Sequence, residues 1–266
     1  MVEGLYTLAE WQKDVNCMIR GLYTSGMGME RETKRLDVIA NNLANASTNG
    51  FKTSGTTNGT FSKLLEDVQV GRTKVDIANY SPDVVSTYTN FSQGSLMSTG
   101  SDKDIAIVND DNAFFEVENA EGEKLYTRNG AFLINKEGYL VTSENYKVMG
   151  QNGPIKFDGA TTIGVSYIGE ITDTSGNVID KLSIKAFENP QTLLNVGGTY
   201  WSAGDTTTEK EFTGEVQQNY LETSNVNTVE EMVNMIEVTR AYEANQKVLQ
   251  ANDELLGRSN SIGKIG

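Results

Sequence analysis

The sequence predicts an α+β fold in which long N- and C-terminal helices form a coiled-coil-like terminal domain and a β-rich domain of antiparallel strands is inserted between them. Near both ends of the chain, apolar residues recur at alternating steps of three and four, the spacing of a helix that packs along one face. In the middle of the chain, short runs of alternating apolar residues are separated by glycine-containing turns, as in antiparallel sheets. Because each helix must cover its apolar face, we expect the two helices to find each other or other chains.

The C-terminal helix is predicted from Asn227 to Leu256. Asn227 or Thr228 can cap its first turn, and Glu230 and Glu231 place negative charge where the helix dipole favours it. Gly257 is the expected stop. Its two adjacent apolar rows are wider than one partner helix covers, so a single partner would leave part of the face in water. An ordinary core helix of a globular domain is the alternative. The first row is Met232, Met235, Thr239, Tyr242, Gln246, Leu249, Asp253 and Leu256, and the second is Ala241, Ala244, Val248, Ala251 and Leu255.

The N-terminal helix is predicted within residues 18–52. Asn49-Gly50 can supply the left-handed backbone of its terminus. Residues 1–17 look like an extension that contributes neither a helix pattern nor a secretion signal, because charged residues such as Glu10 interrupt any apolar core. We therefore expect the native chain to start at Met18. The apolar row of this helix, again at steps of three and four, is Leu22, Ser25, Met29, Glu32, Leu36, Ile39, Leu43 and Ala46.

Between the helices we expect a connector over residues 53–93 and a β-rich domain over residues 94–221, and the C-terminal helix then belongs to residues 222–266. The connector begins with a polar run of Ser, Gly, Thr and Asn and is broken again at Pro82. The predicted strands include Ile105–Val108, Phe114–Val117, Leu125–Thr127, Phe132–Ile134 and Leu182–Phe187, and the predicted hairpin turns are Asn129-Gly130, Glu137-Gly138 and Ser175-Gly176.

The composition excludes several classes of function. The chain has 22 Lys and Arg against 36 Asp and Glu, and this net charge of −14 argues against nucleic acid and anionic membranes as partners. The chain has no histidine, which excludes a Ser-His-Asp or Cys-His nucleophile and argues against a zinc site. Its one cysteine, Cys17, permits no internal disulfide. We expect no cofactor and no small-molecule substrate.

Four aspartates are the strongest candidates for chemistry in the β-rich domain. Paired carboxylates can transfer protons and clustered ones can bind calcium, but these lack the spacing and the glycine of a calcium loop. Solvated turn residues are the favoured interpretation, so we expect no catalytic residue and no metal ligand. Met29 and Met232 are interpreted as packing residues rather than ligands. The four aspartates are Asp102, Asp104, Asp110 and Asp111.

Three stretches of the sequence carry a family resemblance and together cover nearly all of the chain from Met18 to Leu256. They are 18–24, 36–45 and 50–52 at the start, 94–107, 114–115, 126–132 and 138–141 in the centre, and 221–227, 240–245 and 253–256 at the end. The individual residues that carry it are Asn41, Asn42, Asn45, Gly50, Phe51, Tyr126, Arg128, Gly130, Ser224, Asn225, Val226, Arg240, Tyr242 and Glu243. With these signatures the chain resembles the bacterial flagellar basal-body rod proteins, a family related to the flagellar hook protein.

The resemblance implies a structural subunit of the rod that is exported by the flagellar type III apparatus. Its terminal helices would polymerise into the axial drive shaft that crosses the cell wall outside the cytoplasm, while the β-rich domain faces outward. The implied partners are further copies of the chain, adjacent rod and hook proteins and the export machinery, without membrane insertion. The residues implied in helix assembly are Leu22, Met29, Leu36, Ile39, Leu43, Met232, Met235, Ile236, Tyr242, Leu249 and Leu256.

The sequence leaves open the position in the rod and two other classes of function. Residues 61–91 lack the long Gly/Gln/Pro-rich stretch that resemblance to the distal-rod type would imply, which favours the proximal-rod type. A cell-wall glycan hydrolase would use two carboxylates, but nothing in the sequence marks an acid with a raised pKa. A secreted adhesin or effector that uses the same export route is the other alternative.

Overall fold

The computed structural model describes residues 8–58, 85–157, 163–173, 176–204 and 207–262, apart from the side chains of 8–21, 23, 58, 85 and 258–262. The chain forms two compact units, each built from segments far apart in the sequence. The helical unit takes its described residues from 1–41, 55–87 and 229–266, and the β-rich unit takes them from 42–54 and 88–228. Much of the predicted connector, residues 59–84, lies outside the described residues.

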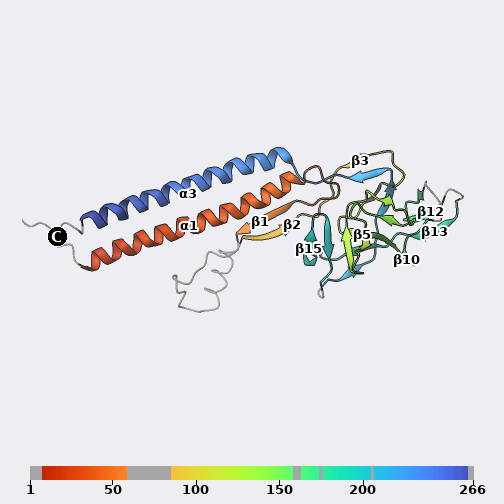
Figure 1. The fold of residues 1–266 in the computed structure, drawn as a ribbon, viewed down its shortest axis with the longest axis horizontal. Helices are drawn as coiled ribbons and strands as arrows, with labels where there is room; N and C mark the ends of the chain where they lie inside the picture. Colours follow the sequence, from red (N-terminus) through yellow and green to blue (C-terminus); the bar gives the residue numbers. More distant parts are fainter. Residues whose placement is uncertain (1–7, 59–84, 158–162, 174–175, 205–206, 263–266) are drawn as a thin grey trace, which may run out of the picture. The chain divides into compact units, whose positions relative to one another are not determined.

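The helical unit is built around two long helices, α1 (Leu8–Ala44) and α3 (Thr228–Ile262). They run side by side in opposite directions (Figure 1), and a Cβ atom added to Gly28 of α1 would lie 3.0 Å from Nδ2 of Asn245 in α3. No helix in the described part of the chain is both long enough and apolar enough to cross a membrane. The fold class is thus α+β, with a helix near each end of the chain.

The helix ends differ from the prediction at three places. α1 begins at Leu8, so the expectation that residues 1–17 contribute no helix was wrong for Leu8–Cys17. α3 continues through Gly257 to Ile262, because a single glycine weakens a helix by only about 1 kcal/mol and ends it only where its backbone turns left-handed. Gly50 has the predicted left-handed backbone, with a φ of 70°, but α1 already ends at Ala44, so Gly50 does not terminate the helix.

The β-rich unit consists of short antiparallel strands. In the described chain, ten strands form one sheet with the order β15-β16-β6-β5-β9-β8-β7, to which β10 adds on β9 and β14 adds on β5 and then β17. Smaller sheets pair β11 and β13 with β12, β18 with β4, and β19 with β3. A two-stranded ribbon that pairs β1 with β2 lies largely in the helical unit. Asn189 caps the short 3-10 helix Pro190–Thr192. The strands are β1 Ser54–Asn58, β2 Val85–Thr89, β3 Leu96–Ser98, β4 Ile105–Val108, β5 Ala113–Glu118, β6 Lys124–Thr127, β7 Leu133–Ile134, β8 Leu140–Val141, β9 Lys147–Gly150, β10 Gly153–Pro154, β11 Gly164–Val165, β12 Glu170–Thr172, β13 Val178–Lys181, β14 Ile184–Phe187, β15 Leu194–Gly197, β16 Tyr200–Ser202, β17 Glu209–Lys210, β18 Glu215–Gln218 and β19 Tyr220–Glu222.

The central strand β5 separates two apolar clusters. Phe115 and Val117 point into the larger cluster, and Phe114 points into the other, because successive side chains of a strand face opposite sides. The second cluster is mainly aromatic, with the rings of Tyr126 and Phe187 packed edge to face at 5.0 Å between their centres. Burial of these large side chains is the main stabilising term of the unit.

The five predicted strands correspond to β4, β5, β6, β7 and β14, and β4 matches residue for residue. The turn at Gly138 is confirmed by a φ of 87°, and Gly176 in the turn between β12 and β13 has a φ of 82°, although Ser175 lies outside the described residues. The predicted hairpin at Asn129-Gly130 is wrong, since β6 and β7 are not neighbours in the sheet. Gly130 instead accepts a hydrogen bond from the amide of Ile105 at 3.1 Å.

Candidate assembly site

The apolar row predicted for the N-terminal helix forms the least exposed side of α1. Ser25, Glu32 and Ile39 are buried, and the other described members, Leu22, Met29, Leu36 and Leu43, are half-buried. The buried carboxylate of Glu32 is held by Arg35 Nη1 at 3.0 Å and by Arg31 Nη2 at 2.8 Å. A polar member of this row is thus neutralised within its own helix.

The face of α3 is rotated relative to the first predicted row. Met235, Tyr242, Leu249 and Leu256 are half-buried, but the alternate members, Met232, Thr239, Gln246 and Asp253, are exposed. Their place on the less exposed face is taken by Glu231, Val238, Asn245 and Asn252. Since three of these four residues are polar, α3 turns a mixed face inward and leaves apolar side chains outside.

The apolar side chains left outside form a stripe on the first turns of α3. Val229, Met232, Val233 and Ile236 follow the steps i, i+3, i+4 and i+7 and therefore share one face of the helix. Their exposed fractions are 70%, 52%, 50% and 53%. We call these four residues the α3 stripe. It lies opposite the row of Glu231, Met235, Val238 and Tyr242, because an α-helix repeats every 3.6 residues. Arg240 and Glu243, two of the signature residues, are exposed further along α3.

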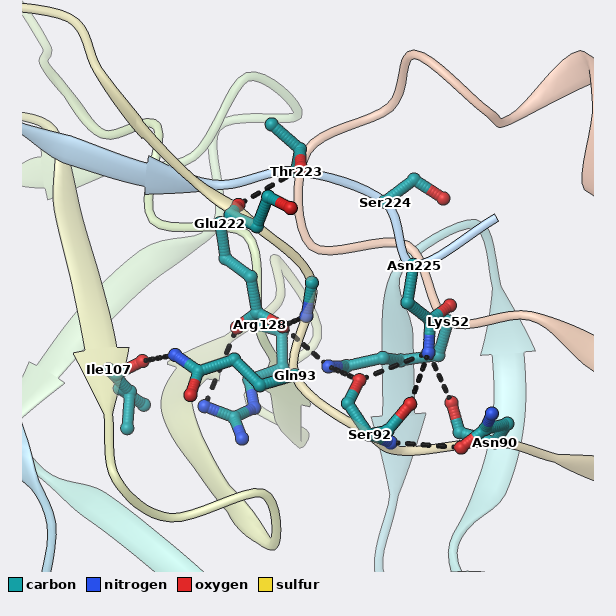
Figure 2. Close-up of polar contacts among 12 residues, drawn as sticks. Lys52, Asn90, Ser92, Gln93, Ile107, Arg128, Glu222, Thr223, Ser224 and Asn225 are labelled. Atoms are coloured by element: carbon teal, nitrogen blue, oxygen red, sulfur yellow. Dashed lines mark hydrogen bonds and ion pairs between the residues drawn. The ribbon is translucent and has the colours of Figure 1, made fainter. Parts of the chain in front are cut away.

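Most of the other signature residues lie in the β-rich unit. Figure 2 shows three of them, Arg128, Ser224 and Asn225, around the place where the N- and C-terminal segments of this unit meet. Lys52 Nζ lies 2.5 Å from Glu222 Oε1 and also donates a hydrogen bond to the carbonyl oxygen of Ser92 at 2.8 Å. Arg128 Nη1 lies 3.6 Å from Glu222 Oε2, and the Arg128 guanidinium lies over the ring of Phe114 at 5.6 Å. The charged side chains of this group, Lys52, Arg128 and Glu222, are at most 1% exposed. We call these three residues the buried ion cluster.

Burial lowers the pKa of both Lys52 and Arg128, and the attraction of Glu222 opposes this shift in each case. Arg128 Nη2 donates to the carbonyl oxygen of Asp110 at 2.5 Å. Two buried cations therefore share one carboxylate, an arrangement that is costly to disturb because a buried charge without a partner is strongly unfavourable.

Two signature asparagines tie the chain segments around this cluster together. Asn225 Oδ1 accepts hydrogen bonds from the backbone amide and the hydroxyl of Thr53, and Asn225 Nδ2 donates to the carbonyl oxygens of Asn90 and Ser92. Asn42 forms a reciprocal pair with the backbone of Ser54, donating to its oxygen at 2.8 Å and accepting from its amide at 2.9 Å. Each of the two asparagine side chains thus both accepts hydrogen bonds from and donates them to the backbone of other segments.

Glycines allow the backbone segments to meet closely here. A Cβ atom on Gly94 would lie 1.9 Å from the carbonyl oxygen of Thr223, and one on Gly50 would lie 2.4 Å from the amide nitrogen of Asn129. No larger residue fits either position without moving backbone. Among the remaining signature residues of the β-rich unit, Phe51 and Tyr126 are buried, and Asn45, Ser224 and Val226 are half-buried. Asn41 belongs to the helical unit and is exposed.

Sequence reasoning did not single out Lys52 and Glu222 as functional residues. Both lie inside stretches that carried the family resemblance, but neither has a local pattern that predicts burial or pairing. Their contact joins positions 170 residues apart. The sequence therefore shows Lys52 and Glu222 only as two charged residues at the edges of the β-rich domain, without a pattern that predicts their contact.

The four aspartates do not form a metal site in the described part of the chain, which holds no suitable group of three or more acidic or cysteine ligands. Asp102 Oδ2 accepts from the amide of Ile163 at 3.0 Å, and Asp110 Oδ1 accepts from the amide of Asn112 at 3.1 Å. Asp104 forms an isolated bridge with Ala131, and Asp111 is exposed. A surface hollow of about 630 Å³ lies elsewhere, lined by Glu116, Lys124, Lys181 and Lys185 among others.

The helices, the β-rich unit and its buried junction define an α+β protein in which segments 42–54 and 222–225 meet at one place within the β-rich unit. Comparison with protein families gives three matches: "Flagella basal body rod protein" over residues 22–52, "Flagellar hook protein FlgE/F/G D1 domain" over 110–181, and "Flagellar basal body rod FlgEFG protein C-terminal" over 217–262. The first match covers most of α1 and the segment after it, the second covers part of the β-rich unit, and the third covers β19 and α3.

Similar proteins cover almost the whole chain. The flagellar basal-body rod protein FlgG of Buchnera aphidicola subsp. Baizongia pistaciae is 34% identical over 90% of this chain and 98% of its own length. FlgG of Agrobacterium fabrum is 33% identical over 89% and 97%, and the rod protein FlgF of Buchnera aphidicola subsp. Schizaphis graminum is 30% identical over 93% and 99%. The chain belongs to the flagellar basal-body rod protein family. It is a structural rod subunit rather than an enzyme, and the comparisons do not support a glycan hydrolase or an adhesin.

Proposed function

We propose that this rod subunit polymerises through its terminal helices into the axial drive shaft of the flagellum. The observation that carries the proposal is the α3 stripe: Val229, Met232, Val233 and Ile236 leave half or more of their surface exposed on one face of one helix. A contiguous apolar face of this kind on a soluble protein is typical of a protein interaction site. The partner proposed for it is a helix of a neighbouring subunit.

The size of the effect fits an assembly contact. Complete burial of one such aliphatic side chain contributes ~1.5–3 kcal/mol, so covering the half that is exposed contributes roughly 1 kcal/mol for each residue. Four side chains together therefore supply a useful part of a subunit contact, while a single subunit in water gains none of it. Repetition along a polymer multiplies the contribution.

The inward faces of the helices support the same proposal. Glu32 on α1 and Glu231 and Asn245 on α3 place polar groups on the faces where a stable isolated pair would carry leucine or isoleucine. The two helices of one subunit therefore gain little from each other alone. We propose that a coiled-coil-like terminal domain is completed by helices of other subunits, with Leu22, Met29, Leu36, Ile39 and Leu43 of α1 contributing to it.

The family supports a location in the flagellar basal body and assembly with other rod and hook proteins. We propose further that the chain is exported by the flagellar type III apparatus, and that the assembled rod crosses the cell wall outside the cytoplasm. The domain limits proposed from the sequence, with 18–52 and 222–266 as the assembling ends, follow from the same interpretation. The proximal-rod position remains a prediction that rests on residues 61–91, and the relatives named above include FlgG and FlgF alike.

The test is incorporation into rods. A strain that lacks the gene would be complemented with Val233→Asp, which puts a charge on the α3 stripe, or with Gln246→Asp, which puts the same charge on an exposed position off the stripe. Isolated basal bodies are then analysed for the subunit by quantitative mass spectrometry. We expect Val233→Asp to be absent from rods and Gln246→Asp to be present. Normal incorporation of Val233→Asp, with equal expression of both variants, would refute assembly through this face.

A further inference from the structure

The buried ion cluster couples two segments of the β-rich unit that are far apart in the sequence. We propose that Glu222 is a latch: its carboxylate makes docking of the N-terminal segment 45–54 onto the β-rich unit conditional on docking of the C-terminal segment 222–225. The two segments then dock together or not at all. This inference concerns folding of the β-rich unit and does not depend on polymerisation of the rod.

The two segments contact each other directly at Glu222. Lys52 Nζ lies 2.5 Å from Glu222 Oε1, with exposed fractions of 0% and 1% for the two side chains. The backbone carbonyl oxygen of Glu222 accepts from the amide of Gly50 at 2.8 Å, and Glu222 Oε1 accepts from the amide of Gly94 at 2.9 Å. Glu222 therefore holds the N-terminal segment through both its backbone and its side chain.

Arg128 is a second buried cation beside Glu222. Arg128 Nη1 lies 3.6 Å from Glu222 Oε2, and its side chain is 0% exposed. The charge of Arg128 disfavours the charge of Lys52, since each cation makes burial of the other less favourable. Asp110 and Asp111 also attract Arg128, but among the described residues Glu222 is the carboxylate that forms ion pairs with the two cations.

Without the charge of Glu222, the two cations lose the carboxylate that they share. Docking of segment 45–54 would then bring Lys52 into an enclosed space beside Arg128 with no carboxylate between them. Like charges in a low-dielectric environment repel strongly, and removal of one partner from a buried ion pair is strongly destabilising. Lys52 would remain in water, and the segment that carries it would stay undocked.

This coupling also sets an order of events. A chain that is produced from its N-terminus has segment 45–54 and Arg128 long before it has Glu222. The strands of the β-rich unit that pair locally, such as β5 with β6, can form earlier because they do not need the latch. The junction between the terminal segments is therefore completed last, when both ends of the unit are present.

The experiment compares amide hydrogen exchange in full-length Glu222→Gln and in the unchanged protein. Two reporters belong to the N-terminal segment: the amide of Gly50, which donates to the Glu222 carbonyl oxygen, and the amide of Thr53, which donates to Asn225. We expect both to exchange about tenfold faster or more in Glu222→Gln, while the amides between β5 and β6 keep their protection. Glu215→Gln, an exposed carboxylate on β18, is the matched control and should change neither set.

A second variant separates the latch from a general loss of stability. Lys52→Met in the Glu222→Gln background removes one of the two cations, so we expect it to restore much of the protection of Gly50 and Thr53. Unchanged exchange at Gly50 and Thr53 in Glu222→Gln overturns the proposal. So does a uniform loss of protection that includes the β5–β6 amides and is not relieved by Lys52→Met, because Glu222 would then act as an ordinary stabilising residue.

Discussion

Asn225 Oδ1 accepts two hydrogen bonds from Thr53, one from the backbone amide at 2.8 Å and one from the hydroxyl at 2.6 Å, across 172 residues of sequence. Its Nδ2 group donates to the carbonyl oxygens of Asn90 and Ser92. We predict that Asn225→Ala lowers the free energy of unfolding of the β-rich unit by roughly 1–3 kcal/mol, since each net hydrogen bond contributes about 1 kcal/mol. Urea unfolding followed by near-ultraviolet circular dichroism measures this.

Asn225→Asp refines that prediction, because aspartate keeps the acceptor for Thr53 but loses the two donors and places a charge beside carbonyl oxygens. It should be as destabilising as Asn225→Ala or more so. Asn195→Ala, on the exposed strand β15, is the control and should be nearly neutral. Equal unfolding midpoints for all three variants would contradict the role assigned to Asn225.

The second prediction concerns pH and the pair Glu116 and Lys124, whose Oε1 and Nζ atoms lie 2.8 Å apart. Burial alone would raise the pKa of Glu116, but hydrogen bonds from Lys124 and Ser183 outweigh it and hold this pKa below its ordinary value of 4.5. As the pH falls, Glu116 is therefore protonated at a higher pH in the unfolded chain than in the folded protein. The stabilisation by Glu116 is complete above about pH 4.5 and is lost as the pH falls through the lower folded-state pKa.

Glu116→Gln should accordingly flatten the fall in stability as the pH drops below about 4.5, as measured by urea midpoints at each pH. Lys124→Gln should move the acid loss to higher pH, since the partner that lowers the pKa is gone. If the stability of Glu116→Gln falls with pH in parallel with that of the unchanged protein, the Glu116 carboxylate does not contribute to the pH dependence of stability.

The third prediction separates the helices from the aspartates. Ile236→Asp places a charge on the α3 stripe and should abolish swimming, because a charge buried in a subunit contact costs more than the ~1.5–3 kcal/mol that the aliphatic side chain contributes. Asp110→Asn combined with Asp111→Asn should leave swimming intact. Motility in soft agar is the measurement, with protein levels checked by immunoblot. Loss of swimming in the aspartate variant alone would favour a calcium-dependent or catalytic role instead.

The fourth prediction is that both terminal helices are largely unfolded in a dilute monomer and become ordered on polymerisation. An isolated subunit leaves the α3 stripe in water while ordering each residue costs ~1–2 kcal/mol of backbone entropy. We expect fast amide exchange over Met29–Leu43 and Met232–Leu249 and protected amides over Phe114–Val141. Strong protection of both helices in a verified monomer would mean that one chain completes its own helical core.

The fifth prediction concerns Gly130, where an added Cβ atom would lie 1.6 Å from the carbonyl oxygen of Ile105. Gly130→Ala must move backbone and break the bond between the Ile105 amide and the Gly130 oxygen, so we expect a loss of about 3 kcal/mol or more. Gly204→Ala, where an added Cβ atom would lie 3.9 Å from the carbonyl oxygen of Thr192, should change the thermal midpoint little. Similar midpoints for both variants would show that the close approach at Gly130 is dispensable.

The sequence by itself determined where the main helices and strands lie. The strand Ile105–Val108 and the turn at Gly138 follow from alternation and from glycine chemistry, both of which act within a few neighbouring residues. The spacing of Ser25, Glu32 and Ile39 likewise predicted the buried side of α1. Such features are local, so their cause is present in any short window of the chain.

The tertiary structure alone decided how distant residues meet. The rotation of α3 that exposes Met232 depends on the partner that covers the opposite face, and the failure of the hairpin at Asn129-Gly130 follows from the approach of Ile105. The contact between Lys52 and Glu222 is the clearest case, because charged side chains are ordinarily solvated. The residues near each of them do not predict a partner 170 positions away. Burial became favourable only when folding brought the opposite charges together.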